Sequence, residues 1–126
     1  MRKGIYLAEI TEEGLLLVRK KDIWILPGGE SKEGEPDDKC LFRKLKEELS
    51  VSEQQIKIYN FYNSFTSRTT FSRSLLEAKV YFGTLNGSLK PSAEISEAKH
   101  IKDFENYKIS EITSKIVSSL IDNKYF

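Results

Sequence analysis

Two adjacent glutamates, Glu47 and Glu48, follow a Pro27-Gly28-Gly29 segment and are the clearest candidates for a metal-binding or catalytic site in this sequence. Neighbouring positions on an α-helix point roughly 100° apart, so these carboxylates can face neighbouring sides of one pocket. Mg²⁺ prefers oxygen ligands and keeps several waters, so a few carboxylates on a rigid support suffice to bind it. Gly29 has no side chain, and its carbonyl can come close enough to add a neutral ligand. We expect a Mg²⁺ site here, in which Mn²⁺ can substitute.

Two basic residues on the same stretch are spaced to contact these glutamates. Arg43 lies four residues before Glu47, close enough to hold its carboxylate by a charge-assisted hydrogen bond. Lys44 lies four residues before Glu48, where an ion pair would take up charge that could otherwise hold further metal ions. We therefore expect Arg43 to orient Glu47, and we expect few or weakly bound metal ions.

The strands that must position this site come first in the chain. Residues Ile5–Ile10 and Leu15–Arg19 are rich in strand-forming residues and flank a polar turn with Gly14, which predicts a β-hairpin. Ile23–Leu26 predicts a further short strand. Pro27 ends it, and Gly28 and Gly29 let the backbone approach a ligand closely.

A helix is expected from about Pro36 to Leu49. Proline suits the first position of a helix because its missing N–H would be unpaired there anyway, and Asp37 and Asp38 suit the positive end of the helix dipole. One face of this helix is apolar at three- and four-residue spacing, which predicts packing on a sheet. Its members are Leu41, Phe42, Leu45 and Leu49.

The second half of the chain alternates between strand and turn patterns before a last helix. The expected strands are Ile56–Tyr62, Leu75–Phe82 and Ala98–Ile101, with 63–73 as a long hairpin connection. Ser110 can cap a helix over Glu111–Ile121, whose apolar face is Ile112, Ile116, Val117, Leu120 and Ile121. We expect one α+β domain over residues 1–126, with a mixed, partly antiparallel sheet between helices.

Composition limits the partners and the compartment. The 20 basic and 19 acidic residues give a net charge of +1, so no general field attracts nucleic acid or an anionic membrane. A single cysteine and the lack of an apolar leader or membrane-spanning stretch indicate a cytoplasmic protein. The single histidine, His100, is expected to be a strand residue.

The site residues resemble the Nudix box, Gly-x5-Glu-x7-Arg-Glu-U-x-Glu-Glu-x-Gly-U, in which U is an aliphatic residue. The residues in register are Gly29, Glu35, Arg43, Leu45, Glu47, Glu48 and Val51. The resemblance implies the α/β/α sandwich of that family, metal coordination by Gly29, Glu47 and Glu48, and support of the loop and metal shell by Glu35. Ser50 replaces the closing glycine of the box, where it either adopts a left-handed backbone or ends the helix differently.

Lys44 departs from the box, because in several members of the family the glutamate at this position is a metal ligand or the general base. An ammonium can be neither at neutral pH, so the base must come from elsewhere. Some members take a catalytic glutamate from a late loop, and the segment 91–97 resembles that loop. Glu94 and Glu97 are the candidates, with Glu97 slightly ahead because it directly precedes the last expected strand.

The resemblance implies Mg²⁺-dependent hydrolysis of a pyrophosphate bond in a nucleoside diphosphate linked to another group. A nucleoside triphosphate, oxidised or not, is the first choice, while dinucleoside polyphosphates and nucleotide sugars stay open. Arg19 is the expected phosphate contact. Two alternatives stand beside the enzyme: a non-catalytic nucleotide-binding module that lost its base at Lys44, and a structural partner-binding domain. A homodimer is also compatible with the sequence.

Overall fold

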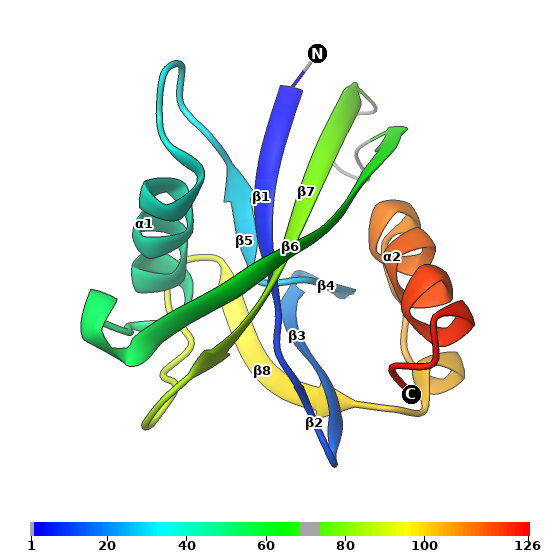
Figure 1. Ribbon diagram of the computed structural model, residues 1–126. Coiled ribbons are helices and arrows are strands. Elements are labelled where there is room, and N and C mark those ends of the chain that lie inside the picture. The colour runs from blue at the N-terminus through cyan, green and yellow to red at the C-terminus, as the bar shows by residue number, and fades with distance from the viewer. Residues whose placement is uncertain (1, 69–73) are drawn as a thin grey trace.

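The computed structural model describes residues 2–68 and 74–126. Figure 1 shows two helices on opposite sides of the strands. The longer elements are β1 (Arg2–Ala8), β3 (Gly14–Lys20), α1 (Asp37–Leu49), β6 (Ile56–Arg68), β7 (Leu75–Leu85), β8 (Ile95–Ile101) and α2 (Glu111–Asp122). The shorter ones are β2 (Ile10–Thr11), β4 (Ile23–Ile25), β5 (Gly28–Glu30) and two 3-10 turns, Glu53–Gln55 and Phe104–Asn106. No helix in this described part is long and apolar enough to cross a membrane.

The strands form two four-stranded sheets. One has the order β5-β1-β7-β6, in which β1 and β7 are parallel and the other pairs antiparallel. The other is antiparallel, with β3 between β4 and β8, and β2 pairs with the start of β3. The expected α+β class, with mixed strands between helices, is confirmed.

The two helices cover separate hydrophobic clusters. The expected apolar face of α1 is confirmed, because Leu41, Leu45 and Leu49 are fully buried against β1 and β3 and Phe42 packs at their edge. The cluster under α2 contains four of its five expected members, Ile112, Ile116, Val117 and Leu120. Ile121 was expected there too, but it is 47% exposed, because it lies past the edge of the contact face. Burial of these stripes fixes both helices on the sheets.

The expected N-terminal hairpin is wrong over most of its length. Residues Ile5–Ala8 pair with β5 and β7, and the hairpin to β3 contains only Ile10 and Thr11. The chain changes sheets at Glu9, whose side chain is buried between them. Its Oε1 lies 2.7 Å from Nε2 of His100 in β8, and its Oε2 accepts a hydrogen bond from the Leu85 backbone N–H at the end of β7.

Other boundaries differ in ways that the pairing explains. Residues 63–68 were expected in a connection, yet they continue β6 because each of them finds a partner on β7. The remainder of that expected connection, 69–73, lies outside the described residues. Ile95 pairs with Lys20 and so brings the start of β8 forward from Ala98. Pro36 was expected to be the first residue of the helix, but it is the residue before α1, which begins at Asp37.

Candidate functional site

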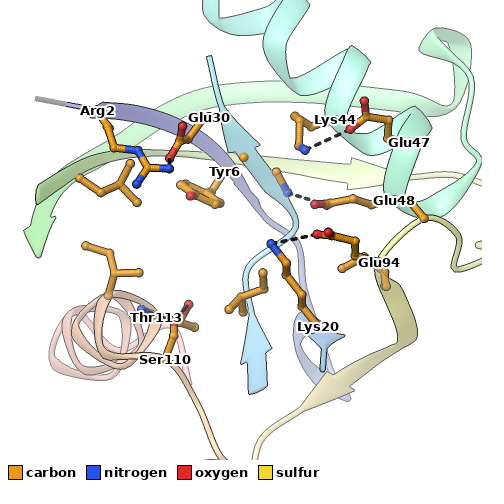
Figure 2. Close-up of a pocket in the computed structure, with 17 residues that line it drawn as sticks. Arg2, Tyr6, Lys20, Glu30, Lys44, Glu47, Glu48, Glu94, Ser110 and Thr113 are labelled. Carbon is orange, nitrogen blue, oxygen red and sulfur yellow. Dashed lines mark hydrogen bonds and ion pairs between the residues drawn. The ribbon is translucent and has the colours of Figure 1, made fainter. Parts of the chain in front are cut away.

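A pocket of about 590 Å³ lies between α1, the N-terminus of α2 and the strand β5. Its charged lining includes Lys20, Lys44, Glu47, Glu48 and Glu94. The apolar part of the wall includes Tyr6, Ile25, Leu76 and Ile112. Figure 2 shows Ser110 and Thr113, at the N-terminal end of α2, across the pocket from the glutamates of α1. The pocket thus joins a charged end to an apolar wall.

Glu48 occupies the buried corner of the charged end and is only 7% exposed. Its Oε1 accepts a hydrogen bond of 3.0 Å from the Gly28 backbone N–H. Burial raises the pKa of Glu48 to about 7, although the Gly28 N–H and the nearby Lys44 ammonium oppose that rise. Gly28 must be glycine here, since its φ is +132° and a Cβ would lie 2.2 Å from the carbonyl oxygen of Ile5. The backbone conformation that presents the Gly28 N–H to Glu48 therefore requires glycine at position 28.

Glu47 lies at the open side of the pocket, with a half-exposed side chain. Its Oε2 is 3.0 Å from the ammonium nitrogen of Lys44. The expected pair between Lys44 and Glu48 is therefore wrong, because Lys44 turns to the glutamate three residues on. The expected hydrogen bond from Arg43 to Glu47 is also wrong, because Arg43 is engaged elsewhere.

Arg43 holds the loop that precedes α1. Its Nε and Nη2 each lie 2.9 Å from an oxygen of Glu35, and Nη2 also donates to the carbonyl of Glu30. Glu35 accepts a further hydrogen bond from the Lys32 N–H, and the Arg43 guanidinium lowers the pKa of Glu35 to about 2. Both carboxylate oxygens of Glu35 thus accept hydrogen bonds from the loop and from Arg43, which fits the expected loop support.

The two loop glutamates are placed differently. Glu94 lines the pocket, where its Oε2 lies 3.0 Å from the Lys20 ammonium, and that hydrogen bond lowers the pKa of Glu94. Glu97 is paired in register with Arg19 across β8 and β3, and their side chains lie 3.3 Å apart. Neither Glu97 nor Arg19 lines the pocket. Of the two candidates for the base, Glu94 is therefore the one on the pocket wall, and Arg19 contacts Glu97 outside it.

Several lining residues escaped the sequence analysis. Lys20, Leu76, Ile112 and Thr113 come from three different elements, β3, β7 and α2, and Tyr6 lies on β1 with its ring over Gly4. Burial raises the pKa of Tyr6, so its hydroxyl is a neutral polar group on the apolar wall. None belongs to a local motif, because only the pairing of distant strands brings them together. Strand alternation could have indicated that Tyr6 shares a face with Gly4, although not what that face contacts.

A divalent ion at this site would find a small donor set. Among the described residues, no three acidic, histidine or cysteine side chains gather closely enough to bind a metal by themselves. The available oxygens are the second oxygen of Glu48, the Glu47 carboxylate and the Gly29 carbonyl, which the Cys40 thiol approaches to 3.5 Å. Mg²⁺ completes its shell with waters and substrate phosphates, so this set fits one such ion.

Comparison with known proteins supports the architecture. A family model described as NUDIX domain matches residues 2–118. The MutT protein of Methanosarcina mazei Go1 has a TM-score of 0.80 at 17% identity, covering 98% of this chain and 95% of that one. The E. coli ORF135 protein has a TM-score of 0.73 at 17% identity, covering 98% and 93%.

An ADP-ribose pyrophosphatase of Streptococcus suis 89-1591 has a TM-score of 0.67 at 15% identity, covering 98% of this chain and 92% of that one. At these identities the likeness to solved structures concerns the fold. The search of curated proteins found no match.

Proposed function

Because the chain belongs to the NUDIX domain family, we propose that it hydrolyses a pyrophosphate bond in a nucleoside diphosphate linked to another group, in a Mg²⁺-dependent reaction. The observation that carries this proposal is the placement of Glu47 and Glu48 at the charged end of a pocket with an apolar wall. A small-molecule nucleotide has the matching chemistry, with an anionic phosphate chain and a planar base.

The cation would be held by Glu48, Glu47 and the Gly29 carbonyl, and Mn²⁺ would substitute for Mg²⁺. Once bound, such an ion supplies charge neutralisation on the phosphate and lowers the pKa of a water molecule. The chain's own part is to fix these donors. The Gly28 N–H holds one oxygen of Glu48, and Arg43 ties the loop around Gly29 to α1 through Glu35.

Glu94 is the proposed general base, because it is the candidate on the pocket wall. A base must lie within reach of the proton that it removes. Its ion pair with Lys20 must open or shift for this role, since that contact lowers the pKa of Glu94 and weakens it as a base. Glu97, held by Arg19, is the weaker candidate.

The apolar wall supports a nucleoside triphosphate, oxidised or not, as the first choice of substrate. Tyr6, Leu76 and Ile112 offer a surface on which a base can pack, and the Tyr6 hydroxyl can exchange a hydrogen bond with it. Dinucleoside polyphosphates and nucleotide sugars also carry a base and a phosphate chain, so they belong in the test.

A non-catalytic nucleotide-binding module is the second candidate. It is favoured by one observation, the pairing of Lys44 with Glu47, which neutralises a carboxylate of the site. Replacing Lys44 with Glu separates the two candidates. A large gain in rate would indicate a decayed site, while little change or a loss would indicate that the native site uses another base.

The experiment is Mg²⁺-dependent product release from nucleoside triphosphates, dinucleoside polyphosphates, ADP-ribose and nucleotide sugars. We expect turnover of one class, and we expect Glu48→Gln to reduce it at least about a hundredfold. Glutamine keeps an oxygen that can accept from the Gly28 N–H, so the variant tests the charge of the side chain. Folded protein that binds nucleotide and turns over no compound would identify the binding module.

A further inference from the structure

The side chain of Lys44 lies directly over Gly29. A Cβ on Gly29 would lie 2.4 Å from Cε and 3.2 Å from Nζ of Lys44, so the absence of a side chain there leaves room for the lysine. Lys44 lines the pocket, and its ammonium nitrogen lies 3.0 Å from Oε2 of Glu47. The lysine side chain therefore lies between Gly29 and Glu47, the more exposed of the two glutamates. Figure 2 shows the Lys44–Glu47 pair.

The contacts of Lys44 leave donors available to a ligand. Among the described residues, Glu47 supplies the one hydrogen-bond acceptor of its ammonium, which has three N–H groups. The side chain is 24% exposed, and Lys44 is one of the residues that line the pocket. A lysine ammonium binds phosphate oxygens as a compact positive charge. The group thus has both the charge and the free donors to contact an anion in the pocket.

We propose that the Lys44 ammonium is a built-in cation of this site, which takes the place of a second divalent ion beside Glu47 and contacts a non-bridging phosphate oxygen of the substrate. This inference rests on the proposed function. The Lys44 ammonium repels further cations near Glu47, so the site holds the one divalent ion bound by Glu48, Glu47 and the Gly29 carbonyl and has no place for a second. Lys44 is then part of how the chain binds a pyrophosphate group.

The first test counts metal ions with Mn²⁺ alone, by electron paramagnetic resonance of the free ion. We expect the unaltered chain to bind about one Mn²⁺ and Lys44→Glu about two, because the new carboxylate replaces a cation with a ligand. Lys46→Glu is the matched control, since Lys46 is exposed on the same helix, and it should leave the count unchanged. Equal counts in the unaltered chain and Lys44→Glu would overturn the proposal.

The second test measures the binding of methylenediphosphonate in the presence of EDTA, which removes metal from the comparison. We expect Lys44→Met to weaken binding about tenfold or more, and Lys44→Arg and Lys46→Met to retain it. Equal affinity in Lys44→Met and the unaltered chain would overturn the proposal. Neither test uses turnover. A chain that hydrolyses no nucleotide yet shows these changes refutes the proposed function alone.

Discussion

At the scale of single residues, Glu48 combines two opposed demands. Its carboxylate must be charged to hold a cation, yet it is almost fully buried, and burial disfavours the charged form. The Gly28 N–H compensates part of that cost, and the pKa still rises to about 7. In the metal-free protein this residue therefore destabilises the fold at neutral and higher pH.

The sign follows from proton linkage. The pKa of Glu48 is raised from 4.5 to about 7, so the folded state binds the proton more tightly than the unfolded state. The contribution of Glu48 to the free energy of unfolding is therefore greatest below about pH 4.5 and is lost as the pH rises through 7. Glu48→Gln removes this dependence. We expect it to raise the free energy of unfolding at pH 8 by about 2–3 kcal/mol and to change it little at pH 4. Urea unfolding in EDTA measures both values.

Glu47→Gln is the matched control for that experiment. Glu47 is half-exposed and paired with Lys44, so removing its charge should give no gain in stability at pH 8. A gain in Glu48→Gln that is equal at both pH values would contradict the linkage, because it would not depend on the charge of the carboxylate.

The site residues were predictable from the sequence where the chemistry depends on local spacing. Gly29, Glu47 and Glu48 line the pocket as their positions indicated. The partner of Arg43 was not predictable. Helix spacing indicated Glu47, whereas the observed partner, Glu35, is brought close by a loop conformation that the sequence does not show. The planar guanidinium fork matches two oxygens of one carboxylate, and this geometry prevails over a single contact along the helix.

At the scale of elements, the end of α1 connects the helix to the candidate base. Ser50 has a left-handed backbone, with φ 57° and ψ 34°, so the first of the two expected alternatives is correct. The carbonyls of Glu48 and Leu49 accept hydrogen bonds from the N–H groups of Ser92 and Lys90. The segment 90–92 therefore caps α1 and places Glu94 beside the pocket.

Glycine should suit position 50 better than serine. We expect Ser50→Gly to raise the free energy of unfolding by about 0.5–1 kcal/mol, because it removes the steric cost of a left-handed residue and loses part of that gain to chain entropy. Ser50→Ala keeps the backbone cost and removes the hydroxyl that lies 3.3 Å from Ser92 Oγ, so it is the control. Thermal unfolding compares them. A Ser50→Gly protein no more stable than Ser50→Ala would show that the backbone carries no strain.

Element types were predictable from periodicity, and their partners were not. Helices α1 and α2 follow from three- and four-residue apolar spacing and from capping residues such as Ser110. The N-terminal run looked continuous, yet it divides at Glu9 between two sheets, because β1 finds its partners in β5 and β7. Such pairing depends on residues far along the chain, which local patterns do not report.

At the scale of the whole molecule, Glu9 joins the two sheets. It follows β1 of one sheet and precedes β2 of the other, and its carboxylate contacts the C-terminal ends of β7 and β8. The pocket takes residues from both sheets, so their relative position sets its shape. His100, expected as a strand residue, lies in β8 and supplies one side of this junction.

Removing the Glu9 carboxylate should therefore weaken the whole fold. We expect Glu9→Ala to lower the free energy of unfolding by about 2–3 kcal/mol, because the Leu85 N–H and the His100 ring each lose a buried partner. Glu9→Gln keeps an oxygen for Leu85 and should lose less. Glu12→Ala, at an exposed position, is the control and should change stability by under about 0.5 kcal/mol. Urea unfolding measures all three. Equal stability of Glu9→Ala and Glu12→Ala would mean that the two sheets are held together by their apolar clusters alone.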